Sequence, residues 1–192
     1  MNAITPKSIP MPQLHTGDVI ACWGTDRVSR VISLMTCSLL PPLRFAWAPS
    51  HVAIIHREGS TDPQWYESTT MVGTTRGAQD HCPRERWQAY GGRCVVLRPT
   101  VVLDGEQRDR MGIALRQMVR EGVPYDMAGA ILSGTRFLRY FVPASGERLF
   151  CSELVARTLM VAQLMNWSSP AGYSPGRLCR ELVSSGAFEV VR

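Results

Sequence analysis

A cysteine stands where a helical pattern begins, in the stretch RLFCSELVART of residues 148–158. Cys151 at such a position can act as a nucleophile, because the positive end of a helix dipole favours the thiolate form. The backbone N–H groups of the same first turn, which includes Ser152, can stabilise an oxyanion. A cysteine can equally serve as a small buried hydrophobe. Whether Cys151 is a nucleophile therefore depends on whether the chain supplies a base and an orienting group.

A base and an orienting carboxylate occur on two successive stretches of strand character. His51 lies in SHVAIIHR and Glu67 in QWYEST. If the two segments form a hairpin, the imidazole and the carboxylate lie side by side, and a carboxylate fixes the tautomer of a catalytic histidine. Tyr125, in GVPYD, offers a further donor to an oxyanion. With Cys151, these residues predict the Cys–His–Glu triad of a thiol hydrolase.

Each of these residues also fits an ordinary structural role. His51 fits a hydrogen-bonded core histidine, and Glu67 fits an edge-strand carboxylate paired with an arginine. Tyr125 fits a packing residue whose hydroxyl reaches water. Ser152 fits a first-turn polar residue that suits the helix end. Spacing alone leaves both interpretations open.

Hydrophobic periodicity predicts the elements that must position these side chains. Short apolar or β-branched runs predict strands at 17–23, 50–57, 64–69, 93–99 and 187–191, and apolar residues at helical spacing predict helices within 26–37, 104–121, 151–165 and 174–186. The polar segment Met71–Gly92 predicts an irregular surface excursion. The pattern indicates an α+β fold, with an antiparallel sheet and helices to one side.

Length and charge narrow the function classes. A chain of 192 residues predicts one domain, here residues 14–192, preceded by an extended arm over residues 1–13. The formal net charge is +5 and comes from arginines scattered along the chain, so we expect no specific nucleic-acid binding. The first residues resemble no export signal, which predicts a cytoplasmic location, with delivery to the envelope only by a non-classical route.

The six cysteines predict free thiols rather than disulfides or a metal centre. No two are spaced C-x-x-C, and no histidine joins them in a zinc-site pattern. Cys22 and Cys94 lie in apolar strand segments and are expected to be buried and inert. His81 and Cys82 are neighbours whose side chains point apart in an extended chain, which makes them a poor catalytic pair. We therefore predict no metal and no cofactor.

Five short motifs, in their order along the chain, resemble those of a known superfamily. The motifs are GDVIACW, SHVAIIHR, YEST, GVPYD and LFCSELV. They are similar to motifs of the papain-like NlpC-type cysteine hydrolases, but with the order rotated, so that the cysteine helix comes last. This order resembles the circularly permuted branch that includes the YiiX- and YaeF-like bacterial proteins and the lecithin:retinol acyltransferase-like enzymes. The resemblance runs from Gly17 to the C-terminus and implies a permuted papain-like domain, an antiparallel sheet or small barrel with the nucleophile helix packed against it.

The resemblance implies a role for each motif residue. Cys151 matches the nucleophile, His51 the general base and Glu67 the third, orienting position. Tyr125 matches the tyrosine near the oxyanion site, and Asp18 matches the aspartate of the GD turn, which we interpret as structural. With glutamate at the third position, the chain resembles the YiiX-like members of this branch, because the acyltransferase-like members generally carry histidine there.

Three functions follow as expectations. The first is a cysteine amidase or endopeptidase that forms a thioester and cleaves peptide amide bonds of peptidoglycan or its fragments. The second uses the same triad on a lipid ester, thioester or acyl amide, since the aromatic and basic stretch of residues 129–143 suits contact with a membrane surface. The third is a catalytically silent binding module. The sequence leaves the exact substrate and the oligomeric state open.

Overall fold

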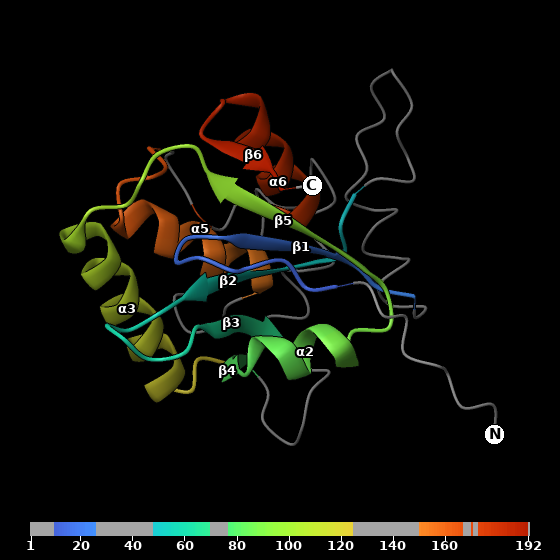
Figure 1. Cartoon of the computed structure of the whole chain (residues 1–192), viewed down its shortest axis with the longest axis horizontal. Helices are drawn as coiled ribbons and strands as arrows, with labels where there is room; N and C mark the ends of the chain where they lie inside the picture. The colour runs from blue at the N-terminus through green and yellow to red at the C-terminus, as the bar shows by residue number, and fades with distance from the viewer. Residues whose placement is uncertain are drawn as a thin grey trace, which may run out of the picture.

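The computed structural model describes residues 10–25, 48–69, 77–124, 150–166, 170 and 173–191. Within these ranges the chain forms an antiparallel sheet in the order β4-β3-β2-β1-β5-β6, with helices against it (Figure 1). The strands are β1 (Val19–Trp23), β2 (His51–His56), β3 (Gln64–Thr69), β4 (Gly77–His81), β5 (Arg93–Pro99) and β6 (Phe188–Val190). The helices are α2 (Pro83–Ala89), α3 (Gly105–Arg120), α5 (Cys151–Val161) and α6 (Pro175–Ser184). The predicted α+β fold is confirmed.

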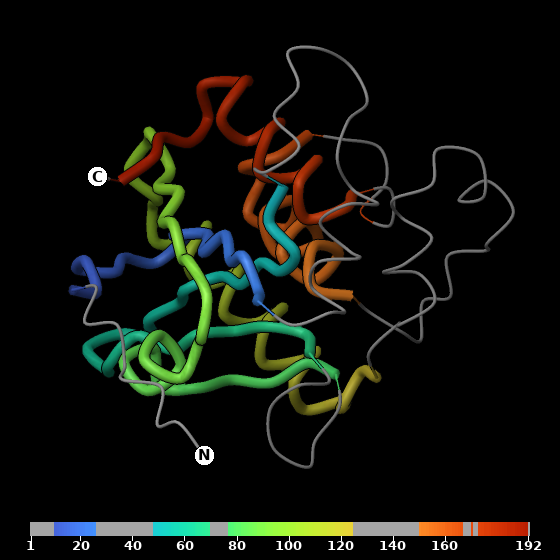
Figure 2. The backbone as a smooth tube through the Cα atoms, turned by 90° about the vertical axis from the view of Figure 1, so that its right-hand side faces the viewer, coloured from blue at the N-terminus to red at the C-terminus, as the bar shows by residue number. Residues whose placement is uncertain are grey.

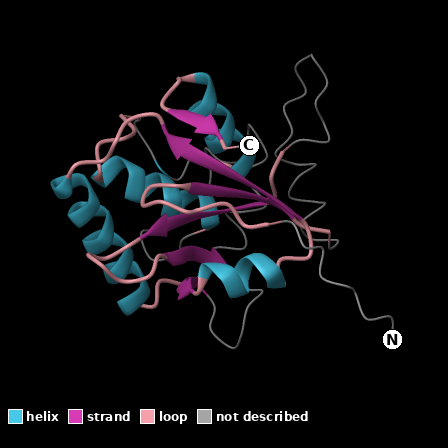
Figure 3. Cartoon of the chain, viewed as in Figure 1, coloured by secondary structure: helices cyan, strands magenta, loops and turns pink. Residues whose placement is uncertain are grey.

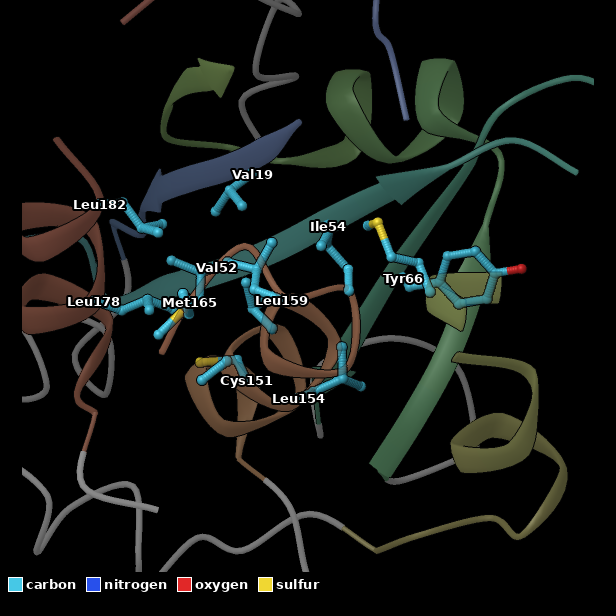
Figure 4. Packing of buried hydrophobic residues seen from close by; sticks show 14 of the residues in the cluster. Val19, Val52, Ile54, Tyr66, Cys151, Leu154, Leu159, Met165, Leu178 and Leu182 are labelled. Carbon is cyan, nitrogen blue, oxygen red and sulfur yellow. The ribbon is translucent and has the colours of Figure 1, made fainter. Parts of the chain in front are cut away.

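The larger hydrophobic core lies between the sheet and helices α3, α5 and α6. Val52 and Ile54 of β2 point into it, and Leu154 and Leu159 of α5 meet them with no exposed surface. Figure 4 shows these side chains together with Cys151 at the start of α5. Burial of each such side chain contributes about 1.5–3 kcal/mol. This packing fixes the start of α5 against β2.

A smaller core lies on the opposite face of the sheet. It contains Ile20, Ala53 and Trp65, and Trp87 of α2 packs against it. Helix α2 therefore lies across the sheet from α5 and α6 (Figures 1 and 2). The expectation of helices on one side only is wrong, because successive strand residues alternate between two faces that are both apolar here.

Segment 71–92 also differs from its prediction. From Gly77 onward it holds strand β4 and helix α2 rather than an irregular excursion (Figure 3). β4 adds an edge strand beside β3, and Pro83 begins α2, where its missing N–H costs no hydrogen bond. Because both elements are short, their hydrophobic periodicity in the sequence is weak. The helix predicted within 26–37 lies outside the described residues.

Helix α5 ends earlier than its apolar pattern predicts. Its last residue is Val161, and Gln163 adopts a left-handed backbone with φ of 59°. None of the described helices has both the length and the apolar character needed to cross a bilayer. The division into a terminal arm and a domain stays a prediction because residues 1–9 are not described, although Leu14 is already buried in the smaller core.

Asp18 anchors the start of β1, in keeping with its predicted structural role. Its carboxylate has no exposed surface and receives two hydrogen bonds from Arg98, at 2.9 and 2.8 Å. The His15 backbone N–H donates to it at 2.8 Å. A bidentate guanidinium pair of this kind fixes the turn into β1 against β5.

Gly77 offers a test of how β4 joins the fold. Its φ is +115°, and a Cβ atom there would lie 2.1 Å from the backbone oxygen of Val123, which also accepts a hydrogen bond from the Ala78 N–H at 3.0 Å. We expect Gly77→Ala to lower the free energy of unfolding by about 2–4 kcal/mol in urea titrations. Gly105→Ala is the control, because it begins α3 with open space around it, and we expect a change of no more than about 1 kcal/mol, towards higher stability. Equal effects of the two substitutions would contradict the close approach.

Candidate active site

Strands β2 and β3 bring the predicted histidine and glutamate together. The two strands pair as an antiparallel hairpin, and His51 Nε2 lies 2.7 Å from Glu67 Oε2. The His51 side chain is 13% exposed, whereas Glu67 has no exposed surface. The carboxylate therefore lies behind the imidazole, on the side away from solvent, as an orienting group requires.

Glu67 is held by further partners that the sequence did not identify by position. The Arg86 Nε atom donates to Oε1 at 2.7 Å, and the Arg86 Nη2 atom donates to Oε2 at 3.3 Å. The indole N–H of Trp65 donates to Oε2 at 3.0 Å, and His81 Nε2 lies 3.4 Å from Oε1. These contacts fix the carboxylate in one orientation.

The partners of Glu67 also set its charge. Burial acts to raise the pKa of the carboxyl group, since it disfavours the ionised form. The contacts from His51 and His81 and the charge of Arg86 outweigh burial and hold the pKa well below its usual range. Glu67 is therefore an ionised acceptor at neutral pH. The arginine pairing that the sequence offered as an alternative to the triad exists in addition to the histidine contact.

Cys151 is the first residue of helix α5. Phe150 precedes it with extended backbone, and the Phe150 carbonyl accepts from the N–H groups of Glu153 and Leu154. The N–H groups of Cys151 and Ser152 come before this first helical hydrogen bond and lie at the positive end of the helix dipole. Cys151 is 2% exposed and belongs to the larger core, and Figure 4 shows its side chain at the start of α5.

His51 links Cys151 to Glu67. Burial acts to lower the pKa of the His51 ring, but the charge of Cys151, a hydrogen bond with Cys151 and the contacts with Glu67 raise it to about 10. Since Nε2 contacts Glu67, the other ring nitrogen is left for the thiol. The raised pKa keeps the imidazole protonated at neutral pH beside the sulfur. The structure brings together the three residues that the sequence selected.

The structure describes only one of the two side chains that we expected at the oxyanion site. The Ser152 hydroxyl is buried and donates to the backbone carbonyl of Tyr173, which ties the start of α5 to the chain before α6. Ser152 can therefore contribute to an oxyanion site only through its backbone N–H. Tyr125 and the stretch 129–143 lie outside the described residues, so their roles stay predictions.

Comparison with known proteins identifies the fold. No family model matches this sequence, and no curated protein matches it. The structure is similar to that of the metalloprotein YiiX from Escherichia coli O157:H7, with a TM-score of 0.59 and 21% sequence identity over 92% of this chain and 96% of that chain. Similarity at this identity establishes a shared fold, and it is consistent with the YiiX-like branch that the motif order indicated.

Proposed function

We propose that this chain is a thiol hydrolase of the permuted papain-like type, with Cys151 as nucleophile, His51 as acid and base, and Glu67 as orienting carboxylate. The observation that carries the proposal is the line of contacts from the start of α5 through the His51 ring to a buried, ionised Glu67. A core histidine needs neither a thiol at a helix start nor a carboxylate that four side chains hold in place. Together these features match an activated cysteine.

The proposed reaction follows from these positions. The Cys151 thiolate attacks an amide carbonyl carbon, and the oxyanion that forms accepts from the N–H groups at the start of α5. Protonated His51 gives its proton to the leaving amine as the C–N bond breaks, which leaves a thioester on Cys151. Water then attacks the thioester, neutral His51 accepts a proton from it, and the thiolate leaves with the carboxylic acid as product. Glu67 keeps the imidazole oriented throughout.

The metalloprotein character of YiiX does not fit the donor set described in this chain. The Arg86 guanidinium contacts both oxygens of Glu67 and so takes the place that a metal cation would need. Within the described ranges, no three His, Cys, Asp or Glu side chains come together as metal ligands. The proposed mechanism therefore uses the side chains of the chain alone.

We propose amide bonds of peptidoglycan peptides as the substrate, on the strength of the motif resemblance. The test incubates wild type and Cys151→Ala with purified muropeptides and measures released amines by mass spectrometry. Wild type should cleave, and Cys151→Ala should lower the rate at least about a thousandfold. Cys82→Ala removes an exposed thiol and serves as the control with wild-type activity.

The outcomes test the identity of the nucleophile and the class of substrate independently of each other. If Cys151→Ala cleaves as fast as wild type, the proposed chemistry is wrong. If wild type leaves muropeptides intact but releases acyl groups from lipid vesicles through Cys151, the triad stands and the substrate class is wrong. If wild type acts on neither, the hydrolase proposal fails.

A further inference from the structure

Two cysteines face each other across neighbouring strands, beside the candidate active site. In the pairing of β1 with β5, Cys22 lies directly opposite Cys94, and in the pairing of β1 with β2 it lies directly opposite His51. Directly opposed residues of neighbouring strands project from the same face of a sheet. The two thiols and the imidazole therefore form one row across β5, β1 and β2, which are adjacent in Figure 1.

The geometry of this cysteine pair suits a disulfide. The two Sγ atoms are 3.6 Å apart. The Cys22 carbonyl accepts from the Ser50 N–H, on the β2 side, so towards β5 the cysteines form a non-hydrogen-bonded pair. The Cα atoms of such a pair are about 4.5 Å apart, and a disulfide spans Cα separations of about 4.4–6.8 Å. Joining the sulfurs requires no rearrangement of the strands.

The two thiols differ in exposure and in charge. Cys22 has no exposed surface, and burial raises the pKa of its thiol, whereas Cys94 is half-buried. A hydrogen bond with Cys22 lowers the pKa of Cys94, and the charges of His51 and Arg86 add to this effect against burial and Glu67. Cys94 is thus the more accessible thiol and the one that ionises first, while Cys22 keeps its proton and lies within reach.

We propose that Cys22 and Cys94 are a modification site at which a peroxide converts the two thiols into a disulfide. The Cys94 sulfur attacks one oxygen of hydrogen peroxide, the S–O bond forms, and the O–O bond breaks as hydroxide leaves and takes up a proton to give water. The Cys22 sulfur then attacks the sulfenic sulfur, the S–S bond forms, and the hydroxide that leaves takes up the Cys22 proton as a second water. The thiols lose two electrons, which reduce the peroxide. This proposal departs from the sequence-based expectation that both cysteines are inert.

The experiment uses the Cys151→Ala protein, so that the proposed nucleophile plays no part. The protein is treated with one equivalent of hydrogen peroxide, free thiols are blocked with N-ethylmaleimide in denaturant so that buried thiols also react, and tryptic peptides are identified by mass spectrometry. Trypsin places the two cysteines on separate peptides, residues 8–27 and 94–108, since Pro99 prevents cleavage after Arg98. We expect these peptides joined by a disulfide, with two hydrogen atoms lost, and expect dithiothreitol to release both.

Two controls distinguish a paired site from exposure alone. Cys94→Ser should leave Cys22 fully alkylated after peroxide, and Cys22→Ser should leave Cys94 as a sulfenic acid or its further oxidation products. Cys82 is more exposed than Cys94, so a reaction governed by exposure would consume Cys82 first. The proposal is overturned if peptides 8–27 and 94–108 stay unlinked, or if either peptide joins a different cysteine instead. Because the nucleophile is absent, this result is independent of any hydrolase activity.

Discussion

We expect an NMR titration of the wild-type protein to show that the His51 imidazole keeps its proton up to about pH 10, whereas an ordinary histidine releases it near pH 6.5. The cause is the negative charge of Cys151 together with the hydrogen bonds to Cys151 and Glu67, which overcome the effect of burial. His56 titrates in the opposite direction, below its ordinary value, because burial and the Arg116 charge disfavour its protonated form. One experiment on the four histidines of the chain therefore measures both shifts.

The raised pKa of His51 also makes the stability of the folded state depend on pH. The folded-state pKa of His51 lies above its unfolded value, so the stability from its contacts is fully present below about pH 6.5 and is lost as the pH rises through about 10. Glu67→Gln removes the charge behind the ring and should move the His51 midpoint down by about 1 unit or more. Glu58→Gln is the matched control, since it neutralises a surface carboxylate paired with Arg116 at 2.7 Å.

The signals are assigned with His51→Asn, which removes the His51 resonance. A wild-type midpoint near 6.5, or a midpoint that Glu67→Gln leaves in place, would contradict the proposed contacts of the ring. A midpoint near 10 that falls in Glu67→Gln, but not in Glu58→Gln, supports the charged triad.

The positions of His51, Glu67 and Cys151 relative to one another were predictable because each is set locally or by a helix end. His51 and Glu67 lie on two strands joined as a hairpin, so alternation and a short connection place them side by side. Cys151 begins an apolar helix, whose face toward the sheet follows from the spacing of Leu154, Leu159 and their neighbours.

The surroundings of Glu67 were not predictable in the same way. Arg86 reaches the carboxylate only because β4 pairs with β3 and α2 then folds across the face of the sheet opposite α5. Neither step leaves a periodic signal in a helix of seven residues that follows a strand of five. In the sequence His81 stands beside Cys82, whereas its relevant neighbour, Glu67, is on the adjacent strand. A buried carboxylate in a predicted core strand was the available hint that a cation had to lie nearby.

Replacing Arg86 by methionine should cause the largest loss of stability among the substitutions considered. Glu67 has no exposed surface, and Arg86 supplies the cation that balances its charge, at 2.7 and 3.3 Å from its oxygens. Methionine keeps the length and apolar stem of the side chain but leaves a buried carboxylate without that cation. We expect the free energy of unfolding to fall by about 3–5 kcal/mol in urea titrations followed by tryptophan fluorescence.

Two further variants show whether the loss comes from charge. Arg84→Met makes the same substitution at an exposed position of α2 and should change stability by no more than about 0.5 kcal/mol. The double variant Arg86→Met, Glu67→Gln removes both charges, so it should recover part of the lost stability while the His51 midpoint stays low. If Arg86→Met matches Arg84→Met, or if the double variant is as unstable as the sum of its single changes, the guanidinium does not balance Glu67. Recovery of stability without recovery of the His51 pKa shift would show that Glu67 has two separate roles. Its pairing with Arg86 stabilises the fold, and its pairing with His51 sets the charge of the imidazole.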